Sequence, residues 1–264
     1  MALLDDAVAI GKAVPELAIL PFVSTLLAYQ KLLATANAPP GGGFKLQVPT
    51  ALPNLWTFVS APSTGVTLKI GVPLEGAPVF FLLEAALVAG FVGSIDDAID
   101  GQSLAFLDHV SAHTLPVLLV HLVTFALSLA AFAIVFAGGL TLAPIATVLS
   151  LVVGYLLWAA PILVVIRDQS AVTALEESVT LALQGGRYTL FSLIYLLGGV
   201  ATSLVLSVGV RGRFLVLLVT AVVLAFPLLI VAVATVQVVR SLLTVDDETI
   251  GDTAEDDPAI NASS

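Results

Sequence analysis

Residues 158–195 read WAAPILVVIRDQSAVTALEESVTLALQGGRYTLFSLIY and decide the interpretation of the whole chain. This stretch begins at the end of one hydrophobic segment and finishes inside the next one. Between the two lie a charged turn, a candidate helix that Asp168 or Ser170 can cap, and the pair Gly185-Gly186, which can end it. A helix held between two apolar segments in this way is typical of a chain that crosses a membrane and lies along its surface between crossings.

The candidate helix is amphipathic. When the chain is wound at about 100° per residue, its apolar side chains gather on one face and its polar side chains on the other. The apolar face holds Val172, Leu175, Val179, Ala182 and Leu183, and the polar face holds Thr173, Glu177, Thr180 and Gln184. We therefore expect this helix to lie in the membrane plane and to connect two spans.

The composition of the chain is that of a membrane protein. Hydrophobic residues make up 59% of the 264 residues, charged residues only 11%, and the mean hydropathy is +1.10. A water-soluble domain carries about a quarter charged residues, so the lipid bilayer is the first partner that the sequence predicts. The net charge of −10 argues against nucleic acid as a partner. This acidic, Ala- and Val-rich composition resembles that of proteins from salt-loving archaea.

Six apolar segments are long enough to cross a bilayer, for which a helix needs about 20 residues. They are residues 14–33, 77–95, 115–137, 143–166, 188–210 and 214–239. Pro21 and Pro227 are expected to kink the first and the last of them. We predict an all-α, polytopic membrane helix bundle of six transmembrane helices. Interfacial amphipathic helices are expected at residues 2–13 and 103–114, in addition to the helix described above.

The chain is predicted to form one membrane domain, residues 1–245, followed by a disordered acidic C-terminal tail, residues 246–264. Its one long loop lies between the first two spans, and there Trp56 and Phe58 suit the level of the lipid headgroups. Residues 66–72 alternate between polar and apolar and are able to pair with Phe44–Val48 as a small hairpin outside the bilayer. Because the first residues lack the basic region of a signal peptide, we expect the first apolar segment to be retained.

The order of features in Trp158–Leu197 resembles that of a known family. A Pro-bearing span end, a charged turn, a helix with the sequence Ala174-Leu175-Glu176-Glu177-Ser178, a Gly-Arg stop and an aromatic-led span follow one another. This order is similar to the multi-pass membrane domain associated with glycerophosphodiester phosphodiesterases and to related stand-alone membrane proteins of unknown function. The resemblance loosely covers residues 2–244. It implies six helices, with the interfacial helices and both termini on the cytoplasmic side of the cell membrane. It does not imply the phosphodiesterase reaction, which belongs to a separate soluble barrel.

Two polar clusters have spacings that occur in known sites. His109 and His113 are four residues apart, as two metal ligands on one helix would be, but no third ligand is recognisable. Asp96, Asp97 and Asp100 resemble the carboxylates that hold magnesium diphosphates in membrane transferases, yet residues 96–114 contain no Lys or Arg for the phosphates. We predict no metal, no cofactor and no catalytic residue.

Glu84 falls near the middle of the second span, where a charged side chain costs about 2.5–3.5 kcal/mol. A residue of this kind is either a functional group or a neutral group that is hydrogen-bonded inside the bundle. His121 of the third span is its expected partner, because pairing lowers the cost of burying both groups. Their depths differ by roughly 7–8 Å at about 1.5 Å rise per residue, a gap that helix tilt or one bridging water can close.

Three classes of function remain open at this point. The leading hypothesis is a non-catalytic integral membrane protein that organises or recruits a membrane or cytoplasmic protein partner through its interfacial helices and tail. The alternative is a small transporter or lipid-handling protein that uses a polar cleft around Glu84. An intramembrane enzyme is the third. Loss of transport on changing Glu84 favours the second class, and a bound metal ion favours the third.

Overall fold

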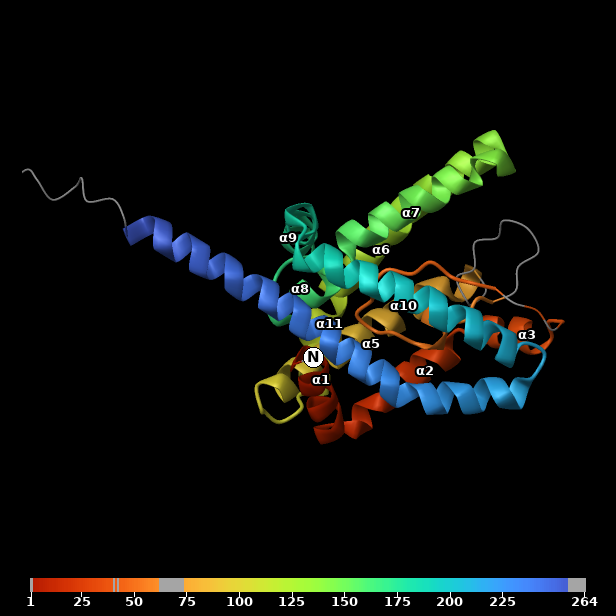
Figure 1. Ribbon diagram of the computed structural model, residues 1–264, viewed down its shortest axis with the longest axis horizontal. Helices are drawn as coiled ribbons and strands as arrows, with labels where there is room; N and C mark the ends of the chain where they lie inside the picture. Colours follow the sequence, from red (N-terminus) through yellow and green to blue (C-terminus); the bar gives the residue numbers. More distant parts are fainter. Residues whose placement is uncertain (1, 40, 42, 62–73, 256–264) are drawn as a thin grey trace, which may run out of the picture.

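The computed structural model describes residues 2–39, 41, 43–61 and 74–255, and the regular elements in these ranges are all helical (Figure 1). Five of the helical segments are long and apolar enough to cross a membrane. They are α5 (Ala77–Ile99), α6 (Phe106–Gly138), α7 (Ala143–Leu157) together with α8 (Ala160–Ile166), α10 (Arg187–Val210) and α11 (Phe214–Glu255). The predicted all-α membrane helix bundle is therefore confirmed.

Helices α5 and α6 pack closely because glycines on α5 leave room for side chains of α6. A Cβ added at Gly90 would lie 2.3 Å from the ring of Phe106, and one added at Gly93 would lie 2.1 Å from Cγ of His109. The sequence predicts this kind of approach from the small residues spaced four apart in the second span. Figure 1 shows α6 and α7 as a long hairpin that projects from the rest of the bundle.

The fourth span is interrupted just before Pro161. Helix α7 ends at Leu157, and α8 begins at Ala160. Because proline has no N–H and its ring crowds the carbonyl four residues earlier, it disrupts the helix at this point. All residues from Ala160 to Val165 are buried, so α8 lies at the centre of the bundle.

Helix α9 (Ala171–Gln184) has the two ends that the sequence predicts. Ser170 is its N-cap, and its Oγ accepts a hydrogen bond from the backbone N–H of Thr173 at 3.2 Å. Gly185 ends the helix with a φ of 74°, a conformation that glycine adopts without strain. In Figure 1 α9 is seen nearly end-on, whereas α10 and α11 run across the picture, so α9 crosses the direction of these spans.

The two faces of α9 differ in exposure. Ala174, Ser178 and Leu181 are buried against the bundle, although Leu181 does not fit the apolar face that the sequence predicts. Val172 and Leu183 are 64% and 76% exposed and point away from the other helices. An outward apolar stripe of this kind suits a helix that rests in the membrane surface.

The first apolar segment is not the single span over residues 14–33 that the sequence predicts. It consists of η1 (Pro15–Ala18), α2 (Ile19–Leu27) and α3 (Tyr29–Ala36), with α1 (Ala2–Ala13) before them. The pair Leu3–Ala13 and Pro15–Leu27 is bent by 96°, and a sixth span exists only if this pair is counted as one.

Pro21 does not cause the breaks in this segment. It is the third residue of α2, where a backbone N–H has no helical partner and proline is tolerated. The helix breaks instead at Val14 (φ −130°, ψ 54°) and at Ala28 (φ −83°, ψ 49°). The expected kink at Pro21 is therefore wrong. Pro227 lies inside the continuous helix α11, which is bent along its length in Figure 1.

The short helix α4 (Leu55–Phe58) lies inside the bundle and contacts α2, α10 and α11. Leu55 and Trp56 are 0% and 3% exposed. The Nε1–H of Trp56 donates to the carbonyl of Thr25 at 2.8 Å, and the backbone N–H of Leu55 donates to Thr25 Oγ1 at 3.1 Å. Phe58 is buried as well, so the expectation that Trp56 and Phe58 rest at headgroup level is wrong.

Asn54 fixes the start of α4 through a capping box. Its Oδ1 accepts a hydrogen bond from the N–H of Trp56 at 3.0 Å, and its own N–H donates to Thr57 Oγ1 at 3.0 Å. Its Nδ2 donates to Ser24 Oγ of α2 at 2.8 Å. The loop is thus anchored to the broken first span.

Residues 103–114 do not form a separate interfacial helix. Helix α6 begins at Phe106 and continues through Pro116 into the third span without a break. Its start is held by Asp97, whose Oδ2 accepts a hydrogen bond from the N–H of Ala105 at 2.9 Å. The predicted boundary at residue 115 is therefore wrong. Pro116 removes only one helical hydrogen bond, and close packing against α5 supports α6 on both sides of this proline.

The last helix extends into the acidic end of the chain. Helix α11 continues to Glu255 and so includes residues 246–255 of the predicted tail, whose disorder stays a prediction. Once a helix exists, each residue added to its end forms one further hydrogen bond. Polar residues can therefore continue a helix that apolar residues began. Residues 256–264 lie outside the described residues.

Phe44–Val48 forms no strand, and its expected partner, residues 66–72, also lies outside the described ranges.

Candidate functional site

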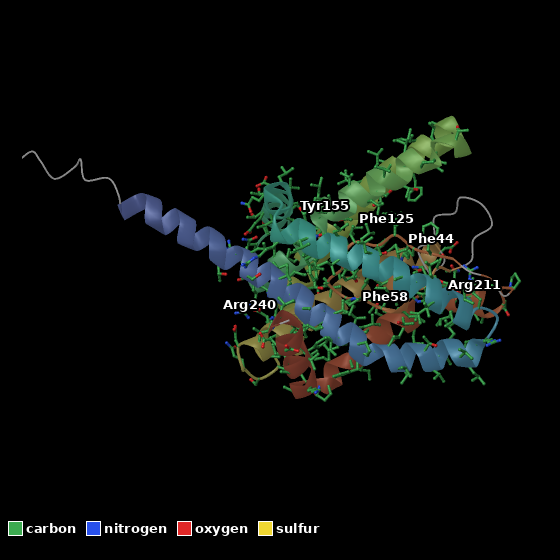
Figure 2. The ribbon with its side chains drawn as sticks, in the orientation of Figure 1. Phe44, Phe58, Phe125, Tyr155, Arg211 and Arg240 are labelled. Carbon is green, nitrogen blue, oxygen red and sulfur yellow. The ribbon has the colours of Figure 1, made fainter. Side chains whose placement is uncertain are left out.

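A cavity of about 640 Å³ lies between the α6–α7 hairpin and the loop that precedes α4. Loop residues 44–52 form one wall, and α5, α6, α7 and α8 supply the others. Figure 2 labels Phe44 of the loop and Phe125 of α6, which both line it. The polar side chains of the lining are Lys45, Gln47, Thr50, Glu84, His121, Thr124, Ser128, Thr147 and Ser150.

Helices α5 and α6 bring both intramembrane candidates, Glu84 and His121, into the wall of this cavity. The two residues are close enough for the charge of Glu84 to act on the imidazole of His121. Within the described part of the chain, no hydrogen bond or ion pair joins them. The predicted pair therefore shares one cavity without direct contact, and a pair bridged by a water molecule stays a prediction.

Two buried polar atoms of the cavity wall have no hydrogen-bond partner among the described residues. They are Nδ1 of His121 and Oγ of Ser150. A buried polar atom without a partner costs about 1–3 kcal/mol. Both atoms belong to residues that line the cavity, but the atoms themselves are shielded from solvent, so they mark polar positions within the wall.

Three further hydroxyl groups of the lining already use their protons inside their own helices. Thr124 donates to the carbonyl of Val120 at 2.9 Å, Ser128 to that of Thr124 at 2.8 Å, and Thr147 to that of Ala143 at 2.9 Å. A hydroxyl oxygen that donates its proton can still accept a hydrogen bond. These groups are therefore acceptors with respect to a molecule in the cavity.

Aromatic side chains form much of the apolar lining. The rings of Phe81 and Phe125 lie 5.1 Å apart between centroids and are tilted by 56°. Phe44, Phe132 and Trp158 also line the cavity. Aromatic faces carry negative electrostatic potential and attract both apolar groups and cations.

Lys45 lies in the loop, outside the spanning helices, and is the only Lys or Arg among the described residues of the lining. Its Nζ donates a hydrogen bond to the carbonyl of Trp56 at 2.6 Å. The residue as a whole is half-buried, but its amino group lies among protein atoms. This burial, and to a smaller extent the charge of Lys31, lowers the pKa of Lys45 to about 7.

The loop wall approaches α7 at Gly154. A Cβ added at Gly154 would lie 2.8 Å from Cγ2 of Val48, so a larger residue there would displace the loop. Both residues line the cavity. The absence of a side chain at Gly154 therefore sets how close the loop lies to the hairpin.

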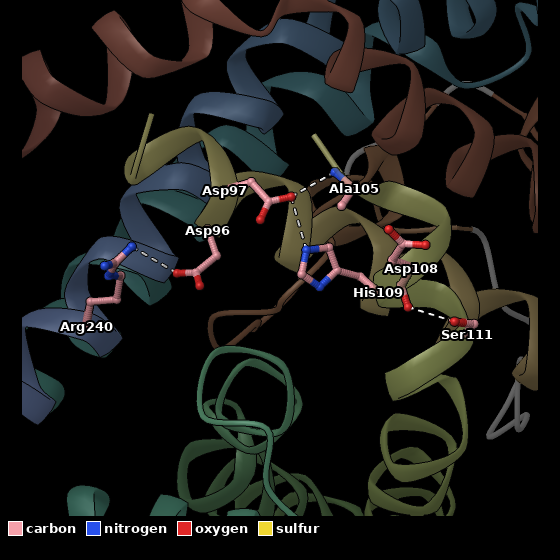
Figure 3. Close-up of polar contacts among 7 residues, drawn as sticks. All are labelled: Asp96, Asp97, Ala105, Asp108, His109, Ser111 and Arg240. Atoms are coloured by element: carbon pink, nitrogen blue, oxygen red, sulfur yellow. Dashed lines mark hydrogen bonds and ion pairs between the residues drawn. The ribbon is translucent and has the colours of Figure 1, made fainter. Parts of the chain in front are cut away.

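A second polar cluster lies where α5 ends, beside α11 (Figure 3). Arg240 donates to Oδ1 of Asp96 at 3.0 Å and to Oδ1 of Asp100 at 2.7 Å. Arg240 follows directly after the sixth apolar segment and is far in sequence from residues 96–114, which contain no Lys or Arg. The predicted topology indicates that Arg240 can reach this cluster, because the second and sixth predicted spans both end on the same side of the bundle.

His109 and His113 take partners from different elements. His109 Nε2 lies 3.1 Å from Oδ2 of Asp97 (Figure 3), and His113 Nδ1 lies 3.7 Å from Oδ1 of Asp168. Their rings are stacked, with centroids 5.9 Å apart. Within the described ranges no group of three or more His, Asp or Glu residues is placed to hold a metal ion. The absence of a metal in the protein stays a prediction.

Comparison of this chain with family models, with curated protein sequences and with solved structures gives no match. The resemblance of Trp158–Leu197 to the membrane domain associated with glycerophosphodiester phosphodiesterases therefore stays a prediction. No ligand or activity follows from a relative. The cavity and its chemistry are the observations on which a function can be proposed.

Proposed function

We propose that the protein binds a small amphipathic molecule in the cavity between loop residues 44–52 and the α6–α7 hairpin, and acts as a small transporter or lipid-handling protein. The observation that carries this proposal is a cavity of about 640 Å³ with Glu84 and His121 in its wall. Ligand pockets measure roughly 300–1,000 Å³ and combine apolar walls with a few polar groups that orient the ligand. An ionisable residue at membrane depth is a functional group by default.

The position of the cavity supports an amphipathic ligand. Its helical walls come from α5, α6, α7 and α8, which are membrane spans by length and composition. Amphipathic molecules concentrate in a bilayer, so they reach such a cavity from the lipid as well as from water. The apolar part of the ligand replaces lipid contacts on the aromatic wall, and its polar part meets the groups around His121.

The proposed role is non-catalytic. Binding uses the polar side chains of the lining as hydrogen-bond partners and requires no bond to be made or broken. We place the protein in the cell membrane with both termini in the cytoplasm, as the resemblance of Trp158–Leu197 implies. A role in recruiting protein partners is the second candidate, and the outward apolar stripe with Val172 and Leu183 on α9 is the surface that favours it.

Filling the cavity tests the binding proposal. Ser150→Leu replaces a buried hydroxyl that has no partner by a larger apolar group in the cavity wall. Val152→Leu is the matched control, since Val152 lies on the same helix and is 46% exposed. The full chain is purified in mild detergent, and co-purifying lipids are quantified by mass spectrometry.

We expect a lipid or other amphiphile in stoichiometric amount with the wild-type protein and with Val152→Leu, and its loss with Ser150→Leu. The fold of both variants is checked by helix content and thermal melting. Equal amounts of bound amphiphile in all three proteins, or none in any of them, would contradict binding in this cavity.

A further inference from the structure

The charges of the cavity wall define which kind of ligand it favours. Among the described residues, Glu84 is the only acidic side chain in the lining, and no ion pair with any of them holds its carboxylate. Lys45 is the only Lys or Arg that the described part of the lining contains, and its amino group is already bonded to the carbonyl of Trp56. The lowered pKa of Lys45, about 7, means that this group is readily neutral. The cavity therefore presents an unpaired carboxylate without an equally free cation.

The hydrogen-bonding groups of the cavity have the same bias. Thr124, Ser128 and Thr147 donate their protons within their own helices and offer only acceptor oxygens. With the carboxylate of Glu84 they give the helical walls four acceptor groups, whereas Gln47 and Thr50 of the loop wall can also donate. A ligand head with N–H donors is therefore satisfied by the helical walls.

The aromatic lining also favours a positively charged ligand. Phe81 and Phe125 form a tilted pair in the wall, and Phe81 lies three residues before Glu84 on α5. Residues three apart on a helix share a face, so an aromatic ring neighbours the carboxylate. A cation above an aromatic face gains about 0.5–2 kcal/mol, depending on how far it is removed from water.

From these three observations we propose that the ligand of this cavity is a cationic amphiphile, an organic amine with an attached apolar chain or ring system. This proposal rests on the proposed function, since it names the ligand class of the same cavity. Glu84 is the counter-charge for the ammonium group, and the hydroxyl oxygens of α6 and α7 accept its remaining N–H groups.

An anionic headgroup fits this wall less well. It would face the carboxylate of Glu84 at close range, and Lys45, the one Lys or Arg in the lining as far as the structure describes it, is held by a backbone carbonyl. Like charges in surroundings of low polarity repel strongly. A neutral alcohol of equal chain length can use the same apolar wall but forms no ion pair. The three head types therefore separate the charge effect from simple apolar binding.

The test compares three probes with the same twelve-carbon chain: dodecylamine, 1-dodecanol and dodecanoate. The full chain is reconstituted into phosphatidylcholine nanodiscs at pH 7, and binding is followed by tryptophan emission, because Trp158 lines the cavity. Empty nanodiscs correct for partition into lipid. Four proteins are compared: wild type, Glu84→Gln, Glu84→Asp, and Glu75→Gln as a control that removes an exposed carboxylate outside the cavity.

We expect wild type and Glu75→Gln to bind dodecylamine at least about tenfold more tightly than 1-dodecanol, which corresponds to about 1.4 kcal/mol. Glu84→Gln should abolish this preference and leave the affinity for 1-dodecanol unchanged, while Glu84→Asp should retain much of the preference. Dodecanoate should bind most weakly. Glu84→Asp keeps the negative charge but shortens the side chain. It therefore still tests the role of the carboxylate if Glu84→Gln fails to fold.

The outcomes separate the two proposals. If 1-dodecanol or dodecanoate binds wild type as tightly as dodecylamine does, and Ser150→Leu weakens the binding of all three, the cavity binds amphiphiles but the preference for a cation is refuted. If Ser150→Leu changes the affinity for none of the probes, binding in the cavity is itself refuted. A preference for dodecylamine that persists in Glu84→Gln refutes the assigned role of Glu84.

Discussion

Replacement of Trp56 by Phe tests whether the loop segment around α4 is inserted among the helices. The Nε1–H of Trp56 donates to the carbonyl of Thr25 at 2.8 Å. That carbonyl lies in the last turn of α2, just before the break at Ala28, where the chain of helical hydrogen bonds ends. Trp56→Phe keeps an aromatic ring in place and removes the donor.

The expected loss of stability follows from two contributions. A buried carbonyl left without its partner costs about 1–3 kcal/mol. The smaller ring buries less apolar area, which costs about 1 kcal/mol more at about 25 cal/mol per Å². We therefore expect Trp56→Phe to lower the free energy of unfolding by about 2–4 kcal/mol.

Trp158→Phe is the matched control, because Nε1 of Trp158 donates to Oγ of Ser192 at 3.0 Å and the residue is equally buried. The hydroxyl of Ser192 can rotate and bond within its own helix, so no group is stranded. Only the contribution of ring size remains, about 1 kcal/mol. Stability is measured by thermal or denaturant-induced unfolding in the same detergent.

The control variant also provides a direct probe of position. The chain has two Trp residues, so Trp158→Phe leaves Trp56 as the sole tryptophan, whose emission can be excited selectively. With an exposed fraction of 3%, Trp56 should emit at short wavelength and resist quenching by acrylamide. Ready quenching by acrylamide, or equal stability losses in the two Phe variants, would refute the inserted position of α4.

Two further predictions concern packing and charge. Gly93→Ala should lower the melting temperature, because its Cβ would lie 2.1 Å from Cγ of His109 and overpacking costs about 1–3 kcal/mol. Gly198→Ala is the control, because a Cβ at this helix position would meet no atom within 4 Å; it should be neutral or stabilising by up to about 1 kcal/mol. Equal effects of Gly93→Ala and Gly198→Ala would contradict the close contact of α5 and α6. Arg240→Met should cost about 1–2 kcal/mol at low salt, since it leaves two half-exposed carboxylates unpaired, and less at high salt. An unchanged melting temperature at low salt would show that this ion pair does not stabilise the fold.

Elements with local start and stop signals were predictable from the sequence. Ser170 and Gly185 mark the ends of α9, and the structure confirms both as caps. The long apolar segments after residue 76 were predictable as well, because length and hydropathy alone decide whether a helix can cross a bilayer. A cap depends on residues within one helical turn, and a membrane span depends on the summed hydropathy of one segment. Both can be evaluated without knowing the contacts between distant residues.

The broken first span was not predictable in this way. The break at Ala28 falls at neither a proline nor a glycine. Donors from α4, the N–H groups of Leu55 and Trp56, bond to oxygens of Thr25. Hydropathy counts the apolar residues of a segment and carries no information about a donor 30 residues away. The same limit explains why Trp56 and Phe58 were expected at headgroup level and not inside the bundle.

The candidate site was predictable only in part. The cost of an ionisable group in lipid leads from the sequence to Glu84 and His121, which the structure places in one cavity wall. Ser150 gives no such signal, because serine is common in transmembrane helices and only its unpaired position in the cavity distinguishes it. Lys45 lies in a loop without periodicity, so neither its burial nor its contact with Trp56 follows from sequence spacing.

The inserted loop and the cavity are parts of one arrangement. Lys45, in the cavity wall, donates to the carbonyl of Trp56, and Trp56 in turn closes the hydrogen bonding of the broken span at Thr25. Val48 of the same wall rests on Gly154 of α7. The loop is thus fixed at both ends, at α2 through Trp56 and at α7 through Val48, and its position sets the width of the cavity.

We therefore expect ligand binding to depend on a residue that does not line the cavity. Trp56→Phe should weaken the binding of dodecylamine, because a loosened α4 releases the loop wall through Lys45. The amine and the alcohol should lose affinity by the same factor, since the carboxylate of Glu84 is untouched. If Trp56→Phe lowers stability while both affinities stay at their wild-type values, the loop wall is held independently of α4. A selective loss of affinity for the amine would instead show that Trp56 acts on the charge of the site and not on its shape.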